Sequence, residues 1–168
     1  MNNEWHKYDM HLYRDSFQNY KVYQIPKAQL IIADVPYNLG TNAYGSNPSW
    51  YVDGDNKNGG KMIFNCMDWQ RDTDTPKIHP TQKPVQLLER LISIFTDEGE
   101  TVIDPCCGSG STLLAAQKMS RKSFGFEVDR NFFNAAKDKV LASFEPDMFQ
   151  MLKFENTIMN PPFAGGKA

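Results

Sequence analysis

The residues best suited to chemistry in this chain lie in a glycine-containing turn. Asp104 ends the run Thr-Val-Ile-Asp, and Gly108 and Gly110 follow it, just before an apolar, helix-favouring run. A strand that ends in such a turn and leads into a helix brings backbone N–H groups up to a cofactor. Glu127 ends the next strand-like run, about 20 residues further on, where α/β folds place the carboxylate that holds a ribose. The spacing predicts a nucleoside-cofactor site. It does not predict a P-loop, because no Gly-Lys-Ser/Thr follows, and the dinucleotide pattern Gly-x-Gly-x-x-Gly is incomplete.

A second candidate is the stretch Asp34-Val35-Pro36-Tyr37, which follows the compact apolar run 28–33. That run predicts a buried strand, and open α/β sheets bind ligands at the carboxyl ends of their strands. Asp34 and the carbonyl of Val35 could accept hydrogen bonds from an exocyclic amine and so localise its lone pair as it attacks. Tyr37 would stack on the base, a contact of about 1–3 kcal/mol. Taken alone, however, these residue types are more typical of an ordinary turn.

Composition limits the classes of protein to which the chain can belong. Its 168 residues, 40% of them apolar, suit one domain with a real core. The formal net charge of −2 lacks the basic excess of most nucleic-acid binders, so any such contact must use local patches. Three cysteines offer neither a disulfide framework nor metal-ligand spacing, and no metal site is expected. No signal peptide or membrane-spanning run is evident, so a cytoplasmic location without a membrane partner is expected.

The remaining reactive side chains are interpreted as structural. Cys106 and Cys107 are adjacent and are expected to act as small apolar fillers of the core. His6, His11 and His79 are scattered along the chain, and we expect ordinary surface or packing histidines.

The elements that must position these residues follow from apolar periodicity. We expect a short helix and loops over residues 1–27, strands at 28–33, 61–66, 101–104 and 122–127, and helices starting at Pro84, at 111–119 and at 129–144. Apolar residues at helical spacing should form the buried faces of the first and last helices: Val85, Leu88, Leu91, Ile92 and Phe95, then Phe132, Phe133, Ala136, Val140 and Leu141. Strand, helix, strand and helix in close succession predict an α/β fold with a parallel sheet and right-handed crossovers.

Four stretches, in residues and in order, resemble the S-adenosylmethionine-dependent DNA amino-methyltransferases, which methylate adenine N6 or cytosine N4. They are Ala-Asp-Val-Pro-Tyr-Asn-Leu-Gly at 33–40, the run from His-Pro-Thr-Gln-Lys-Pro at 79–92, the glycine turn, and Gly-Phe-Glu-Val-Asp at 125–129. The order is similar to that of the permuted class, in which the catalytic motif precedes the cofactor motif. The resemblance implies a Rossmann-like methyltransferase fold, with a mostly parallel sheet, helices on both faces and fewer strands than the full family fold.

The resemblance also implies roles for particular residues. The catalytic stretch would be Asp34, Val35, Pro36 and Tyr37, acting on a base flipped out of duplex DNA. S-adenosylmethionine would be the cofactor, and the residues expected to bind it are Asp15, Thr81, Gln82, Lys83, Asp104, Pro105, Gly108, Gly110, Ser111 and Glu127. Of these, Asp15 would contact the cofactor adenine, although an isolated Asp is more often a helix cap.

The chain departs from the family pattern in its middle. Only 41 residues separate Tyr37 from His79, where the family has further strands and a target-recognition region. We therefore interpret residues 1–168 as a single methyltransferase-like domain with a catalytic strand and loop at 28–40, a loop-rich shortened region at 41–78, a cofactor-binding half at 79–144 and a tail at 145–168. No separate target-recognition domain is expected, and a homodimer or a partner chain would supply DNA recognition.

The tail carries a competing motif. Asn160-Pro161-Pro162-Phe163 resembles the catalytic tetrapeptide of the unpermuted classes, and only one strand can occupy that position beside the cofactor. The Asp34 stretch has the better strand before it and is the favoured catalytic motif.

The sequence thus favours a DNA methyltransferase that modifies adenine N6 rather than cytosine N4. Two alternatives stay open. One is a methyltransferase acting on RNA or on protein glutamine, where Asn-Pro-Pro-Phe also occurs. The other is a catalytically weak or inactive remnant that binds cofactor or DNA.

Overall fold

In the computed structural model, the residues described are 3–33, 70–79, 81–148 and 150–152. They form a five-stranded sheet in the order β1-β2-β5-β4-β3. The strands are β1 (Glu4–Lys7), β2 (Met10–Tyr13), β3 (Leu30–Ile31), β4 (Thr101–Asp104) and β5 (Lys122–Phe126). Every neighbouring pair is parallel except β1 with β2. The prediction of an α/β fold with a mostly parallel sheet is confirmed.

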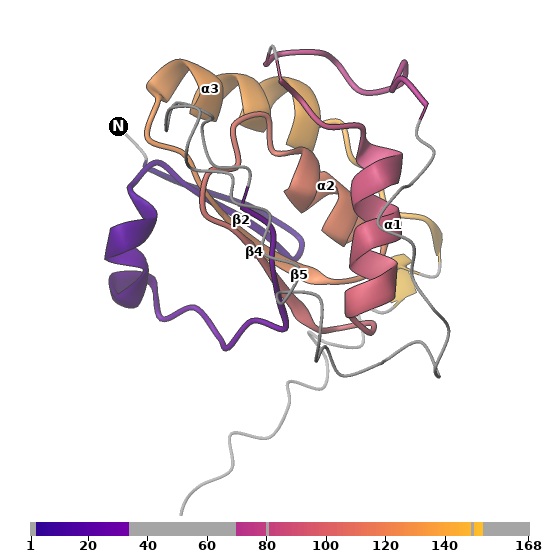
Figure 1. Cartoon of the computed structure of the whole chain (residues 1–168), viewed down its shortest axis with the longest axis horizontal. Coiled ribbons are helices and arrows are strands. Elements are labelled where there is room, and N and C mark those ends of the chain that lie inside the picture. The colour runs from indigo at the N-terminus through magenta and orange to yellow at the C-terminus, as the bar shows by residue number, and fades with distance from the viewer. Residues whose placement is uncertain (1–2, 34–69, 80, 149, 153–168) are drawn as a thin grey trace, which may run out of the picture.

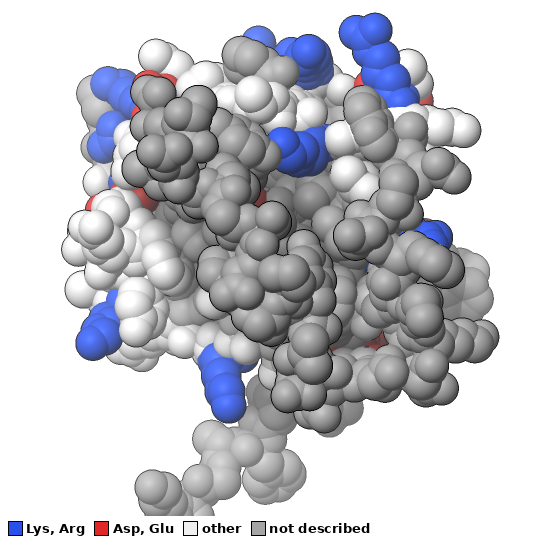
Figure 2. Space-filling view, viewed as in Figure 1, with Lys and Arg blue, Asp and Glu red and all other residues white. Residues whose placement is uncertain are grey.

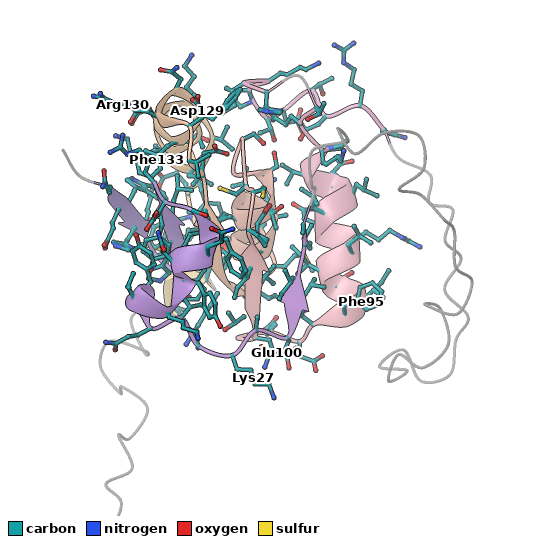
Figure 3. All side chains as sticks on the ribbon, turned by 60° about the vertical axis from the view of Figure 1, so that its left-hand side comes forward. Lys27, Phe95, Glu100, Asp129, Arg130 and Phe133 are labelled. Carbon is teal, nitrogen blue, oxygen red and sulfur yellow. The ribbon has the colours of Figure 1, made fainter. Side chains whose placement is uncertain are left out.

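The register of the parallel strands brings their carboxyl ends to one edge of the sheet. Ile31 pairs with Ile103, Asp104 with Gly125, and Tyr13 with Phe126. Figure 3 shows the polarity. Lys27 and Glu100, which precede β3 and β4, lie at one end of the sheet, and Asp129, which follows β5, lies at the other. We call the end of the sheet that carries Asp104 and Phe126 the carboxyl edge.

Helices cover both faces of the sheet (Figure 1). One face packs against α1 (Val85–Phe95), α2 (Ser111–Lys118), and α3 (Arg130–Ala135) with its π-helical continuation η3 (Ala136–Leu141). The other face carries the 3₁₀ helix η1 (Phe17–Tyr23), which packs through Phe17 and Tyr23 on Tyr13, Ile103, Phe124 and Phe126. The larger core therefore lies on the side of the three α-helices, and the predicted two-sided covering is confirmed.

Close packing of α2 on the sheet depends on one glycine. A Cβ atom added to Gly125 in β5 would lie 2.6 Å from Leu113 Cδ1 and 3.0 Å from Cys107 Sγ. Real Cβ atoms do not make contacts this short, so only glycine lets the start of α2 approach the strand here. Because Leu113 is completely buried, it has little room to move aside.

Several predicted elements differ from those observed. Residues 1–27 contain strands β1 and β2 as well as the short helix. Strand β2 is paired on one side by β1, its neighbour in the sequence, and on the other side by the distant strand β5. The strand at 28–33 is shorter than predicted, since only Leu30–Ile31 forms β3. It is also less buried: Ile31 is 56% exposed because, within the described residues, β3 pairs with β4 alone. The strand predicted at 61–66 lies outside the described residues.

The helix predictions are confirmed except at their margins. Pro84 is the N-cap of α1 and not its first residue, and Phe95 at the helix end is 46% exposed, pointing away from the core (Figure 3). Leu91 and Phe132 are only half-buried, because each lines a cavity described below. In the part of the chain that the structure describes, no helix is both long and apolar enough to span a membrane.

Candidate functional site

A cavity of about 980 Å³ opens at the carboxyl edge of the sheet. Most of the cofactor-binding residues predicted from the sequence line it: Thr81, Gln82, Lys83, Asp104, Pro105, Gly108, Ser111 and Glu127. Its volume lies within the range of small-molecule and cofactor sites, at the strand ends where α/β sheets bind ligands. The residues predicted from the sequence therefore form one wall of a cavity that is large enough for a small-molecule cofactor.

The glycine turn is fastened to the end of β5 by backbone hydrogen bonds. The Cys107 N–H donates to the Phe126 carbonyl at 2.9 Å, and the Gly108 N–H donates to Glu127 Oε2 at 2.9 Å. Gly108 has φ +48°, a left-handed conformation that a residue with a Cβ adopts at a cost. The turn is thus held in one position relative to the strand beside it.

Glu127 is held by two backbone donors, one on each carboxylate oxygen. Oε2 accepts from Gly108, and Oε1 accepts from the Asp129 N–H at 2.8 Å. Asp129 in turn caps α3, because its side chain accepts from the Asn131 and Phe132 N–H groups. Each ionised carboxylate oxygen can accept more than one hydrogen bond. Glu127 therefore lines the cavity as a positioned acceptor with capacity for hydroxyl groups of a ligand.

The N-terminus of α2 also faces the cavity. Gly110, its N-cap, has φ +76° and carries no side chain that could accept the first N–H groups of the helix. Ser111 and Thr112 line the cavity, and the Ser111 hydroxyl pairs with that of Ser109 at 2.8 Å. Helix N-termini carry a partial positive charge, which favours a carboxylate or another anionic group nearby. Gly110 itself does not line the cavity: it packs against Leu141 and forms the turn.

The loop that precedes α1 forms another wall and is braced by its own side chains. Gln82 Oε1 accepts from the Ile78 N–H at 2.9 Å, and Gln82 Nε2 donates to the Pro76 carbonyl at 3.1 Å. Asp72 Oδ2 accepts from the Val85 N–H at 3.1 Å and so caps α1 from a distant position in the chain. Burial of Asp72 opposes ionisation, but hydrogen bonds from Val85, Thr75 and Asp74 outweigh it and lower the pKa of this carboxyl.

The strand that leads to the predicted catalytic stretch ends at the same cavity. Ile32 and Ala33 line it, and the Ile32 N–H donates to the Ile103 carbonyl at 2.9 Å, which continues the pairing of β3 with β4. Asp34, Val35, Pro36 and Tyr37 lie outside the described residues, as do Asn160, Pro161, Pro162 and Phe163. The arrangement of the strands nevertheless brings the residue before Asp34 to the cavity that contains Gly108.

A family model matches this sequence. The model of the DNA methylases, N6_N4_Mtase, matches residues 44–138, more than half of the chain. The chain belongs to this DNA methylase family. The resemblance inferred from four short motifs is therefore confirmed.

Individual proteins of known type match over shorter stretches. The type II methyltransferase M2.DpnII of Streptococcus pneumoniae is 39% identical over 67 residues, which are 40% of this chain and 25% of that protein. The type II methyltransferase M.HindIII of Haemophilus influenzae is 40% identical over 62 residues, or 37% of this chain and 20% of that protein. The matched part thus spans a quarter or less of these two relatives.

Solved structures match in the same way. The crystal structure of the M1.HpyAVI–SAM complex has 42% sequence identity with this chain and a TM-score of 0.36. The match covers 37% of this chain and 30% of that one.

Asp15 lies beside the cavity and not in its lining. Its carboxylate accepts hydrogen bonds from Tyr23, Asn19 and the Ser16 N–H at 2.7–2.9 Å, and the bond from Tyr23 is the main cause of its lowered pKa. Ser16, not Asp15, is the N-cap of η1. Ser16, Phe17 and Gln18 do line the cavity. Asp15 therefore braces the segment that forms this wall.

Several residues that line the cavity were not predicted from the sequence. His79, expected to be an ordinary surface or packing histidine, lines the cavity, and its ring centroid lies 4.4 Å from that of Phe132. Cys106 is exposed in the cavity, so the prediction of an apolar filler is wrong for it. The prediction fits Cys107, which is buried, and burial is the main cause of the raised pKa of its thiol. The position of His79 directly before Pro-Thr-Gln-Lys was the available signal.

Proposed function

We propose that this chain binds S-adenosylmethionine in the cavity at the carboxyl edge and methylates an exocyclic amine of a flipped DNA base. Adenine N6 is favoured over cytosine N4. The observation that carries the proposal is that Gly108, Glu127 and Ala33 all line one cavity. Ala33 directly precedes Asp34, so the donor site and the proposed catalytic stretch share an opening. Membership of the DNA methylase family supports the reaction class.

The residues of the cavity fit this cofactor. Glu127 would accept hydrogen bonds from the ribose hydroxyls, because backbone donors hold its two oxygens in place. Ser111 and the N-terminus of α2 favour the carboxylate of the methionine part. Asp104 is buried beside them and would face the ammonium group of that part. When bound, the cofactor supplies an electrophilic methyl group on a sulfonium.

The other predicted residues would shape the site. Thr81, Gln82 and Lys83 would close over the methionine end, and Pro105, Gly108 and Gly110 would set the path of the turn. Asp15 would act through its hold on η1, whose residue Phe17 lines the cavity.

The catalytic stretch would act on the amine of the flipped base. The Asp34 carboxylate and the Val35 carbonyl would accept its N–H bonds and concentrate its lone pair towards the methyl group. Tyr37 would stack on the base and Pro36 would make the turn rigid. Direct transfer requires neither a metal nor a covalent intermediate, so most of the rate acceleration would come from positioning.

DNA recognition is proposed to come from outside this domain. The face shown in Figure 2 carries described Lys and Arg side chains at separate places and not in one patch, and the net charge is −2. Residues 41–78 are too few for the target-recognition region of the family, so a second copy or a partner chain would supply it. A cytoplasmic location is part of the same proposal.

Two measurements test the function. Calorimetry with S-adenosylhomocysteine tests the cofactor site. Transfer of labelled methyl groups to DNA, RNA and protein in parallel, followed by mass spectrometry of the nucleosides, tests the substrate. We expect N6-methyladenine in DNA, lost in Asp34→Ala and kept in Asn160→Ala. Cofactor binding without any methylated product would favour an inactive remnant, and labelled RNA or protein would favour the alternative substrates.

A further inference from the structure

His79 contacts groups from three separate parts of the cavity wall. Its Nδ1 lies 3.3 Å from the Thr81 backbone nitrogen and 3.1 Å from the Thr81 hydroxyl. Its ring lies 4.4 Å from that of Phe132 in α3, with the two planes at 54°. A Cβ atom added to Gly108 would lie 3.7 Å from His79 Cδ2, so the ring also packs against the glycine turn. One half-buried side chain thus joins the loop before α1, the glycine turn and α3.

The hydrogen bond from the Thr81 backbone N–H determines the tautomer of the neutral imidazole. A backbone N–H can only donate, so Nδ1 must be the acceptor, and the proton of the neutral ring lies on Nε2. Thr81 is exposed, and the loop reaches the cavity through Thr81, Gln82 and Lys83. Gln82 braces the loop on the side of Ile78 and Pro76, whereas His79 braces it on the side of the glycine turn.

We infer that His79 is a positioning residue, which holds the loop containing Thr81, Gln82 and Lys83 against the glycine turn so that the cavity is formed before the ligand arrives. This inference rests on the proposed cofactor site. Without His79, binding would have to order the loop as well, and the ordering would weaken affinity.

Three substitutions of His79 separate its two contacts. His79→Asn keeps an acceptor where Nδ1 stands but loses the ring. His79→Phe keeps the ring against Phe132 but loses the acceptor, and His79→Ala loses both. Calorimetry with S-adenosylhomocysteine should show affinity about tenfold weaker for His79→Ala, and about threefold weaker for each of the other two. His6→Ala removes an exposed histidine of β1, outside the cavity lining, and should bind within about twofold of wild type.

A second measurement does not depend on the ligand. Hydrogen exchange of the Thr81 amide, followed by NMR in the free protein, should be faster in His79→Ala and His79→Phe than in wild type, and unchanged in His79→Asn. Affinity of His79→Ala equal to wild type, or a Thr81 amide that exchanges equally in all variants, would overturn the inference. Failure of the wild-type chain to bind would instead count against the proposed function, and the exchange rates would still decide whether His79 positions the loop.

Discussion

The Gly108 N–H donates to Glu127 Oε2 at 2.9 Å, so the turn after β4 and the end of β5 are joined within the cavity wall. The bond links two motifs that the sequence separates by 19 positions. Glu127 consequently has two functions in the proposed site: it orders the turn, and it presents acceptors to a ligand. The first function can be measured without any cofactor.

Glu127→Gln should weaken both the fold and cofactor binding. The amide keeps one oxygen acceptor, but its NH₂ group would oppose one of the two backbone donors. We expect the free energy of unfolding to fall by about 1–3 kcal/mol and affinity for S-adenosylhomocysteine to fall more than about tenfold. Urea denaturation and calorimetry measure the two effects. Glu145→Gln, at a side chain 79% exposed, is the matched control and should change neither. Wild-type affinity in Glu127→Gln would exclude Glu127 from the site.

Gly125→Ala should destabilise the packing of α2 on the sheet. The added methyl group meets Leu113 and Cys107 at 2.6 and 3.0 Å, and overpacking of this kind costs about 1–3 kcal/mol of unfolding free energy. Leu113→Ala makes room but leaves a cavity. The double variant should therefore be less destabilised than the sum of the two single variants, by about 1 kcal/mol. Strict additivity in urea denaturation would show that the two side chains do not compete for the same space.

Asp72→Ala should destabilise α1 although Asp72 is 13 positions away from Val85. Removing a side-chain cap costs about 1 kcal/mol of unfolding free energy, while Asp72→Asn keeps an acceptor and should lose only part of that. Asp74→Ala is the neighbouring control. Its exposed carboxylate accepts from the Thr73 hydroxyl and makes no bond to the helix, so it should change little. Equal effects at the two positions would argue against the cap.

Stability should depend on pH through His11. Burial, followed by the charges of His6 and Lys122, lowers the pKa of His11 from 6.5 to about 4. The unfolded chain therefore binds a proton that the folded chain does not, between these two values. The contribution of neutral His11 to the free energy of unfolding is therefore fully present above pH 6.5 and is lost as the pH falls towards 4. Thermal unfolding at pH 7 and at pH 4.5 should show that His11→Gln loses less stability between these two pH values than wild type does. Parallel losses would contradict this assignment.

The part of the fold that could be predicted is the part governed by local patterns. The succession of β4, α2, β5 and α3 follows from short apolar runs separated by glycine, acidic and proline signals, and its bounds are close to those expected. The lining by Gly108 and Glu127 follows from the same spacing, because parallel strands end at one edge.

The rest depends on contacts that no local pattern records. Strand β2 is buried because it lies between β1 and β5, and β5 comes more than a hundred positions later in the chain. His79 belongs to the cavity because Phe132, distant in sequence, packs on its ring. Asp72 caps a helix across a loop. Each of these depends on which segments the fold brings together, which propensity and periodicity do not determine.

The three N-terminal strands, β1, β2 and β3, limit how far this protein can be shortened from its N-terminal side. Residues 44–138 match the family, yet β1, β2 and β3 all precede that range and supply three of the five strands that the structure describes. A fragment cut to the matched residues would leave β5 without β2 and β4 without β3, so that both sides of the remaining pair of strands would offer unpaired backbone groups to neighbouring molecules. Such a fragment should aggregate, so shortened versions made for crystallisation or fusion should begin before Glu4.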